Sequence, residues 1–395
     1  MPPSALQIAG YLRDTAPLVG PSTVQIDLTD ACNQNCIVCW LHAPDLKQHN
    51  QERVERQASL PWDTYLSLID ELKTLGTSEL YFAGGGEPLV HPRAWDALQA
   101  AVQRGFTTSL HTNFSLVDED DIQRILDLGI HHLTISLWAG SPEAYRRTHP
   151  RAEDGDFERI SGNIRLLNDR KEDRPTTKLY HVLTTHNAHE LTAMFQLADE
   201  LGCDAVEFAV AETLPGMTDS HGLTPEDAAQ LSEELTAWGD RAVWRRPRLM
   251  GGAALATRLQ AITQGLSCDT ELVHQMPCFA GWTYSRVMAD GRVIPCLKAH
   301  RIPSGNLADS SFSEIWAGAK QTSFRRAGRA ARKTDPLFEL VGNEEGVSCG
   351  CERGCDNLAE NQRTTARMDV LSRLELAVLR HAPKQWIVPG GEAGS

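Results

Sequence analysis

The sequence contains no uninterrupted apolar run near the ~18 residues that a membrane-spanning helix requires. It also lacks a long basic stretch, and its formal net charge is −14, from 38 basic and 52 acidic residues. Residues 1–20 show no basic segment followed by an apolar block, so we expect no secretory signal. These absences predict a cytoplasmic protein with no membrane partner and no nucleic-acid partner.

The sequence also lacks internal repeats and long low-complexity tracts. Its 395 residues include an ordinary share of apolar residues, 41%, which is enough to bury a large core. Length alone indicates roughly two to three domains. We therefore expect an ordinary globular chain.

Ten cysteines occur in a chain that shows no secretory signal, which argues against a framework of disulfides. The cysteines are clustered, with three at positions 32–39 and three at 349–355, and the others are spread between these groups. Clustered thiols in a reducing compartment indicate metal thiolates. The two groups predict two metal sites.

Short apolar segments alternate with amphipathic ones between Thr23 and about Val210. The predicted strands are Val24–Leu28, Glu79–Ala83, Thr108–His111, His132–Leu137, Leu179–Leu183 and Ala205–Val210. The predicted helices between them are Pro61–Leu75, Pro92–Arg104, Glu119–Leu128, Phe157–Leu167 and Ala188–Leu201. Strands separated by helical crossovers predict a parallel sheet, open or partly closed into a barrel.

Polar and chemically active residues follow the first four predicted strands. The first strand leads to Cys32, Cys36 and Cys39, and the second leads to Gly84-Gly85-Gly86-Glu87-Pro88. Thr112-Asn113 ends the third strand, and Ser136 closes the fourth. Because ligands bind at the carboxyl ends of parallel strands, we expect these residues to converge on one site.

The spacing of the three cysteines, C-x3-C-x2-C, offers three ligands in one tight loop. Three thiolates on a [4Fe–4S] cluster leave one iron free to bind another molecule. The alternatives are a zinc loop or inert buried thiols. Zinc sites favour paired C-x2-C units that supply four ligands, and only Cys36 and Cys39 form such a pair here.

A different pattern begins at Cys278. Ser285–Ala289 and Arg292–Ile294 flank Asp290-Gly291, which is the signal of a two-residue β-hairpin. Cys296 follows the hairpin, a helix is predicted around Phe312–Ala317, and another is predicted near Thr364–Arg380.

These motifs resemble those of the radical S-adenosylmethionine (SAM) superfamily. The cysteine triad, the Gly-Gly-Glu-Pro after the second strand and the Thr-Asn after the third match its signature. The segment from Cys278 through Asp290-Gly291, Cys296 and Gly305-Asn306-Leu307 to Cys355 resembles the SPASM/Twitch extension of one branch. The two resemblances cover about residues 23–360.

The resemblance implies an α/β fold, a partial (β/α)6 TIM-like barrel followed by a small cysteine-rich SPASM/Twitch domain. The expected divisions are an extension at 1–22, the barrel at 23–215, a helical linker at 216–275, the SPASM/Twitch domain at 276–360, and a helix and tail at 361–395. The implied cofactors are a SAM-binding [4Fe–4S] cluster, one auxiliary [4Fe–4S] cluster and SAM. The implied electron donor is a flavodoxin or ferredoxin.

Site residues follow from the same resemblance. Gly85, Gly86 and Glu87 are expected to meet the amino group of SAM, and Ser136 its ribose or carboxylate. Further candidates are Asn113 and an arginine for the carboxylate, either Arg147 or Arg146. The expected cluster ligands are Cys32, Cys36 and Cys39 for SAM cleavage, and Cys278, Cys296, Cys351 and Cys355, with Cys349 as a replacement, for the auxiliary cluster.

Other residues carry weaker signals. Cys268 is a possible sixth ligand of the second site, whereas Cys203 is expected to be a small buried apolar residue. His111, Tyr284 and Glu207 are candidates for substrate contact or proton handling, and no catalytic residue is assigned.

The resemblance implies a radical SAM oxidoreductase or lyase. The first expectation is hydrogen abstraction from a polar small molecule such as a sugar or cyclitol, giving oxidation, epimerisation or elimination. The alternative is a maturase that crosslinks a ribosomally made peptide, although the short stretch before Thr23 leaves no room for a separate leader-binding domain there. A further alternative is a non-enzymatic iron–sulfur electron carrier or scaffold.

Overall fold

The computed structural model describes residues 4–13, 17–238, 246–266, 270–342, 350–352 and 354–370. Its strands are β1 (Thr23–Asp27), β2 (Glu79–Ala83), β3 (Thr107–Thr112), β4 (His132–Ser136), β5 (Thr176–Leu183), β6 (Ala205–Val210), β7 (Arg248–Met250), β8 (Tyr284–Val287), β9 (Arg292–Ile294) and β10 (Gly305–Asn306). One sheet contains all of them, in the order β10-β9-β8-β1-β2-β3-β4-β5-β6-β7.

Helices precede, separate and follow these strands along the chain. They are α1 (Ala5–Arg13), α2 (Gln51–Arg56), α3 (Trp62–Thr74), α4 (Ala94–Gln103), α5 (Glu119–Leu128), α6 (Pro142–Thr148), α7 (Asp156–Arg170), α8 (Leu191–Glu200), α9 (Pro225–Trp238), α11 (Gly252–Thr263), α12 (Thr270–Val273), α13 (Ala280–Thr283), α14 (Phe312–Ala317), α15 (Ala319–Gly328) and α16 (Leu358–Val370).

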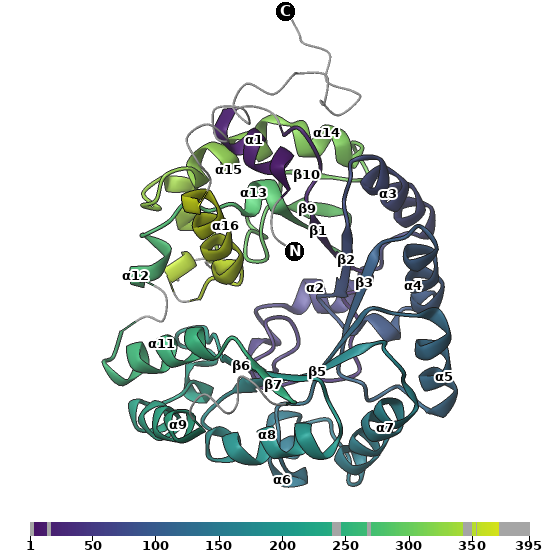
Figure 1. The fold of residues 1–395 in the computed structure, drawn as a ribbon, viewed down its shortest axis with the longest axis vertical. Helices are drawn as coiled ribbons and strands as arrows, with labels where there is room; N and C mark the ends of the chain where they lie inside the picture. Colours follow the sequence, from purple (N-terminus) through teal and green to yellow (C-terminus); the bar gives the residue numbers. More distant parts are fainter. Residues whose placement is uncertain are drawn as a thin grey trace, which may run out of the picture.

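The strands from β1 to β7 are all parallel, and the sheet curves into a partly closed barrel with helices such as α3, α4, α5 and α7 on its outer face (Figure 1). This arrangement confirms the predicted α/β fold with a partial barrel. Within the described residues, β7 and β10 form the two ends of the sheet, so the barrel remains open at one side.

The two faces of a barrel strand differ in burial. Thr177, Leu179, His181 and Leu183 of β5 are fully buried, and the residues that alternate with them are half-buried. Side chains alternate between the faces of a strand, so one face packs under the helices and the other lines the barrel. The lining face includes Tyr180, and it is polar and partly accessible.

Helix α5 shows how the sequence defines the outer layer. The Asp118 side chain caps its first turn by accepting a hydrogen bond from the Asp121 N–H, and Gly129 ends the helix with φ 66°. Ile122 and Ile125 are fully buried against the sheet. Local capping and one apolar face thus place the helix on the barrel.

The C-terminal hairpin continues the barrel sheet. β8 pairs in parallel with β1, and β9 pairs antiparallel with β8. Buried Asp27 of β1 accepts two hydrogen bonds from Nε of Arg286, at 3.1 and 3.0 Å, and one from its Nη2, at 2.6 Å. The predicted barrel and SPASM/Twitch segments therefore share one sheet.

Sequence patterns missed some elements and misplaced others. β7 was expected to be part of a helical linker, because three residues beside Arg246-Pro247 carry too little alternation to indicate a strand. The last helix was predicted at Thr364–Arg380, whereas α16 begins at Leu358. The predicted part beyond Val370 lies outside the described residues.

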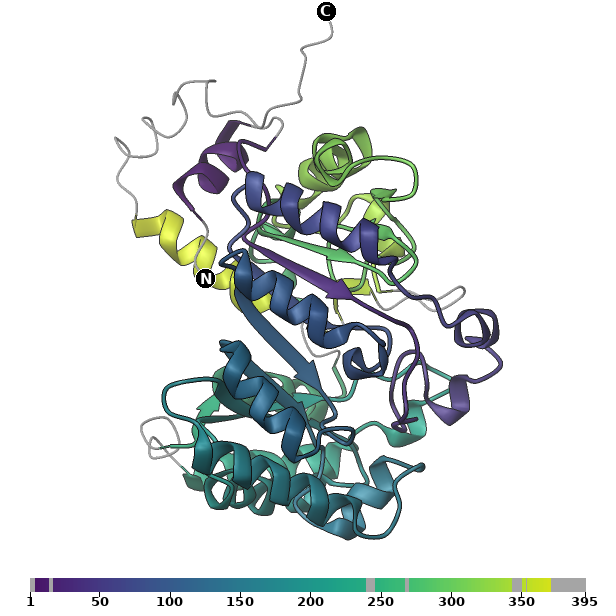
Figure 2. The ribbon, with the colours of Figure 1, turned by 90° about the vertical axis from the view of Figure 1, so that its right-hand side faces the viewer.

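Figure 2 shows the β1 arrow pointing to the side on which the following loop and α2 lie. The cysteine triad belongs to this loop, so it lies at the carboxyl end of the first strand. Within the described part of the chain, no helix is both long and apolar enough to cross a membrane.

Candidate active site

The cysteine triad is held in place by local backbone hydrogen bonds. The Gln34 N–H donates to Sγ of Cys32, and the His42 N–H donates to Sγ of Cys39, each over 3.4 Å. The Cys39 N–H also donates to the carbonyl of Cys36 at 3.0 Å. Donors aimed at sulfur favour the thiolate, which is the form that binds iron.

Without a metal, the surroundings of the triad disfavour three thiolates. Burial raises the pKa of Cys32 to about 12, and the pKa values of Cys36 and Cys39 are raised by burial as well. The negative charges of the Cys32 and Cys39 thiolates raise the pKa of Cys36 further, because like charges repel at short range. Such a set of thiols fits a cationic cluster that offsets burial and repulsion.

Several buried polar atoms near the triad have no hydrogen-bond partner within the described residues. They include the side-chain oxygens of Gln34 and Asn35 and the indole N–H of Trp138. Trp138 adopts a left-handed φ of 54° and packs in one apolar cluster with Ile37 and Val38. Because buried polar groups are normally paired, these atoms fit a site that a cofactor completes.

The glycines after β2 allow this loop to pack against the loop that carries the triad. A Cβ on Gly86 would lie 1.9 Å from the carbonyl oxygen of Ala31, and a Cβ on Gly85 would lie 2.0 Å from Oδ1 of Asp30. The Gly86 N–H donates to the carbonyl of Thr29 at 3.0 Å. The close approach predicted for SAM is thus also required by the protein's own chain.

Glu87 is buried and joins the ends of β2 and β3. Its carboxylate accepts hydrogen bonds from Oγ1 of Thr112 at 2.7 Å, the Asn113 N–H at 2.8 Å and the Leu89 N–H at 3.1 Å. Burial raises its pKa, and these three donors oppose that rise. The Glu87 side chain therefore fixes the ends of β2 and β3 relative to each other beside the triad loop.

Asn113 connects the end of β3 to the triad loop. Its Nδ2 donates to Oδ1 of Asn33 at 2.9 Å, and its Oδ1 accepts from Oγ of Ser115 at 2.7 Å. Ser136 is half-buried at the end of β4. The structure thus brings Gly86, Glu87 and Asn113 to the triad loop, with Ser136 on the next strand end.

The structure places the predicted arginines on the surface of α6. Arg147 is exposed and forms an ion pair with Glu143 at 2.5 Å, and Arg146 pairs with Asp154 at 3.0 Å. Arg151, beyond the end of this helix, donates instead to the carbonyl of Cys32 at 3.4 Å. Arg151 therefore contacts the triad itself, through the backbone of Cys32.

A second missed feature is the network around Asp30. Arg53 of α2 donates to both carboxylate oxygens of Asp30, at 2.6 and 3.0 Å. Nε2 of His42 lies 2.8 Å from the Asp30 carbonyl. Asp30 lies two residues before Cys32. Arg53 is distant from it in the sequence, so no local motif predicts this ion pair.

The auxiliary cysteines come from three segments of the chain. Cys278, Cys296, Cys351 and Cys355 lie close enough that the charges of some raise the pKa values of others. Burial is the larger cause, and it raises the pKa of Cys351 to about 12. As at the triad, this donor set fits a cationic cluster.

Three cysteines remain besides these two groups. Cys349 and Cys268 lie outside the described residues. Cys203 is buried in the main apolar core. No set of three His, Cys, Asp or Glu side chains in the described ranges is arranged to hold a single metal ion.

The inner face of the barrel carries polar side chains. The Tyr81 hydroxyl lies 2.6 Å from Nδ1 of His111, and Nζ of Lys178 lies 2.6 Å from Oε2 of Glu207. Burial lowers the pKa of His111 to about 3, so its ring is neutral. Tyr284 instead donates to Oε1 of Gln25 at 2.9 Å.

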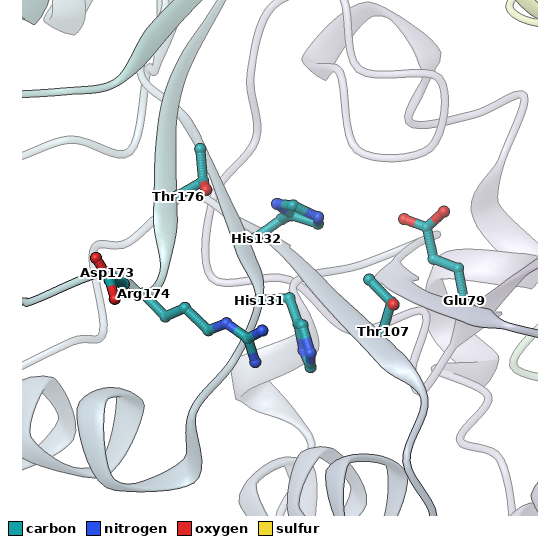
Figure 3. Close-up of a pocket in the computed structure, with 7 residues that line it drawn as sticks. All are labelled: Glu79, Thr107, His131, His132, Asp173, Arg174 and Thr176. Carbon is teal, nitrogen blue, oxygen red and sulfur yellow. The ribbon is translucent and has the colours of Figure 1, made fainter. Parts of the chain in front are cut away.

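A pocket at the opposite end of the barrel does not belong to this site. It is lined by Glu79, His131, His132 and Arg174 among others, at or just before the first residues of β2, β4 and β5 (Figure 3). The triad and the glycine loop lie at the carboxyl ends of the strands, whereas this pocket lies at their amino ends.

Comparison with known proteins agrees with the motifs. The radical SAM superfamily model matches residues 26–198, and a model of the SPASM iron–sulfur cluster-binding domain matches residues 278–339. The chain belongs to the radical SAM superfamily and carries a C-terminal SPASM domain. A SAM-binding [4Fe–4S] cluster, auxiliary iron–sulfur chemistry and SAM are therefore its cofactors.

Several curated proteins are similar over most of their length. The AdoMet-dependent heme synthase of Methanosarcina barkeri is 27% identical over 76% of this chain and 83% of that protein. The PqqA peptide cyclase of Gluconobacter oxydans is 27% identical over 75% of this chain and 76% of that protein.

Solved structures share the fold. The SAM-bound SuiB of Streptococcus suis superposes with a TM-score of 0.60 and 17% identity, over 85% of this chain and 73% of that chain. Native anSMEcpe with bound AdoMet gives a TM-score of 0.61 and 16% identity, over 91% and 99%.

Proposed function

We propose that this radical SAM enzyme modifies a peptide, which was the alternative of the sequence analysis and not its first expectation. The observation that carries the proposal is the similarity to the Gluconobacter oxydans PqqA peptide cyclase over three quarters of each chain. Three further relatives with the same name are 24 to 25% identical to this chain.

The geometry of the barrel opening supports a peptide substrate. A groove of about 970 Å³ is lined by residues of α9, α11 and α16, together with Leu249 of the end strand β7. These elements lie at the open side of the barrel (Figure 1). The lining of the groove contains only small, apolar and uncharged polar side chains. An extended peptide suits such a place, because it can pair its backbone with β7, the end strand of the sheet in the described part of the chain.

We assign the first cluster to Cys32, Cys36 and Cys39. When bound, the cluster and SAM supply a 5′-deoxyadenosyl radical that abstracts hydrogen from the substrate. The carbonyls of Gly85 and Gly86 are assigned to the amino group of SAM.

The neighbouring side chains orient SAM in this proposal. Arg151 is assigned to the SAM carboxylate, in place of Arg147 and Arg146. Ser136 stays a candidate for the ribose. Glu87 and Asn113 hold the surrounding loops in position.

We assign one auxiliary cluster to Cys278, Cys296, Cys351 and Cys355, the arrangement of a Twitch-type extension. The four thiols lie close together in buried positions, as described above. The domain divisions of the sequence analysis remain proposals, with the shared sheet joining the barrel to the auxiliary segment.

A polar small molecule is the second candidate substrate. The observation in its favour is the polar inner face of the barrel, where Lys178 and Glu207 form an ion pair and Tyr81 contacts His111. A sugar or cyclitol has hydroxyl groups that such side chains bind.

Deuterium transfer separates the two substrates. The reconstituted protein is incubated without oxygen with SAM, dithionite and either a panel of deuterated short peptides, including any encoded beside its gene, or a panel of deuterated sugars and cyclitols. We expect deuterium in 5′-deoxyadenosine from the peptide alone, with the Cys32→Ala variant as the blank.

Two other results would overturn parts of the proposal. Transfer from a sugar or cyclitol, with none from the peptide, supports the second candidate. Absence of 5′-deoxyadenosine formation from protein with a full triad cluster would support an electron carrier or scaffold instead of an enzyme.

A further inference from the structure

Lys298 occupies a buried position between the two groups of cysteines. It follows Cys296 by two residues and is 7% exposed. Its Nζ forms an ion pair with Oε1 of Glu212, which lies just beyond β6, and donates to the carbonyl of Gly354. Because Gly354 directly precedes Cys355, the ammonium group ties the auxiliary loop to the barrel.

The same ammonium group also contacts the triad segment. Its Nζ lies 5.8 Å from the centre of the Trp40 ring, and Trp40 directly follows Cys39. Lys298 is therefore in contact with the neighbours of one cysteine from each group. The path Cys39–Trp40–Lys298–Gly354–Cys355 consists only of covalent neighbours and these contacts.

The surroundings of Lys298 are closely fitted to it. A Cβ on Gly354 would lie 1.8 Å from Oε1 of Glu212, so glycine is needed where the carboxylate approaches the loop. The backbone carbonyl of Lys298 accepts a hydrogen bond from the Gly342 N–H at 2.8 Å. Hydrogen bonds thus hold both the backbone and the ammonium group of Lys298, so its positive charge stays between Glu212 and the auxiliary loop.

We propose that Lys298 is a positioning residue that holds the auxiliary loop against the triad segment and raises the reduction potential of the auxiliary cluster. Reduction adds negative charge to a cluster, and a fixed cation nearby stabilises the reduced form. Glu212 opposes this effect with its own charge. The inference rests on the SPASM assignment and goes beyond the proposed function, because it holds for either substrate.

Two substitutions of the same ion pair separate charge from structure. Lys298→Met removes the cation and Glu212→Gln removes the anion, so both break the pair but change the local charge in opposite directions. The full reconstituted chain is titrated with dithionite in the presence of redox mediators, and the auxiliary cluster is followed by EPR. Iron content verifies that each variant retains its clusters.

We expect Lys298→Met to lower the reduced-to-oxidised ratio of the auxiliary cluster at the wild-type midpoint about tenfold, ~59 mV for one electron. Glu212→Gln is expected to raise that ratio, and Lys298→Arg to keep it near the wild-type value. Lys171→Met serves as the control, since Lys171 forms a similarly buried ion pair with Asp204 at 2.5 Å, before the first residues of β5 and β6.

The proposal would be overturned if Lys298→Met and Glu212→Gln shift the midpoint potential of the auxiliary cluster in the same direction, or if neither variant shifts it. If Lys298→Met loses its auxiliary iron, Glu212→Gln decides the question. A midpoint at or below the wild-type value in that variant contradicts the inference, and a higher midpoint supports it.

Discussion

The two cysteine groups are built in different ways. Cys32, Cys36 and Cys39 lie within eight residues on one loop, and backbone donors from Gln34 and His42 reach two of their sulfurs. The four auxiliary cysteines come from segments up to 77 residues apart, Cys278 to Cys355, so only tertiary packing brings them together. A local motif can be recognised in a sequence, whereas an assembled site depends on the whole fold.

The two regions also depend on each other through one sheet. β8 of the auxiliary region pairs with β1, the strand that leads into the triad loop. Lys298 adds a second connection at the carboxyl ends. We therefore expect the chemistry of the two regions to be separable by mutation, but not their stability.

The largest expected effect separates the two chemistries. Cys32→Ala should abolish the formation of 5′-deoxyadenosine, because a cluster loses one of the three ligands that leave an iron open for SAM. Cys355→Ala should retain SAM cleavage and lose substrate turnover. Both products are measured by liquid chromatography. If Cys355→Ala also abolishes cleavage in protein with a full triad cluster, the two regions are not chemically separate.

The next effect concerns the connection between the regions. Arg286→Met leaves the fully buried Asp27 without its cationic partner, which we expect to lower the free energy of unfolding by about 3–5 kcal/mol. Urea denaturation measures the change. The Asp27→Asn/Arg286→Met double variant should recover part of it. A loss below about 1 kcal/mol in Arg286→Met would mean that the ion pair does not hold the regions together.

A smaller effect concerns packing within the triad region. Gly86→Ala places a Cβ 1.9 Å from the Ala31 carbonyl oxygen, and we expect it to cost about 1–3 kcal/mol and weaken SAM cleavage. Gly162→Ala is the matched control, because Gly162 lies within α7 and a Cβ there meets nothing within 4 Å. This control should stabilise the protein by about 0.5–1 kcal/mol. Equal behaviour of the two variants in urea denaturation would contradict the packing account.

The smallest effect compares two neighbouring arginines. Arg151→Ala should raise the KM for SAM about tenfold, since it removes a charge that we assign to the SAM carboxylate. Arg147→Ala should leave the KM unchanged and cost at most about 0.5 kcal/mol, because its pair with Glu143 is exposed. The reverse ranking of the KM values would restore Arg147 as the carboxylate ligand.

Sequence patterns predicted the fold well where the signals are local. The bounds of β2, β6, α5 and α14 agree with prediction to the residue, because apolar alternation, capping residues and turns define them. β7 is too short for such a signal. The parallel pairing of β8 with β1 was not predicted, since two strands 261 residues apart, Thr23 and Tyr284, share no sequence pattern.

The site was less predictable than the fold. The triad and the glycine loop were evident as motifs, and the structure brings them together. Three partners were not evident, namely Arg53 for Asp30, Arg151 for the Cys32 carbonyl and Lys298 for Glu212. Each pair joins distant segments, and charged residues are common enough that sequence alone does not indicate which ones meet.

Iron content of paired variants tests the central claim of two separate cluster sites most directly. The reconstituted wild-type chain should contain about eight iron atoms, four for each [4Fe–4S] cluster. Replacing Cys32, Cys36 and Cys39 by alanine should leave about four and abolish SAM cleavage, and replacing the four auxiliary cysteines should leave about four and retain it. A wild-type chain with about four iron atoms, or loss of all iron in either variant, would contradict the account.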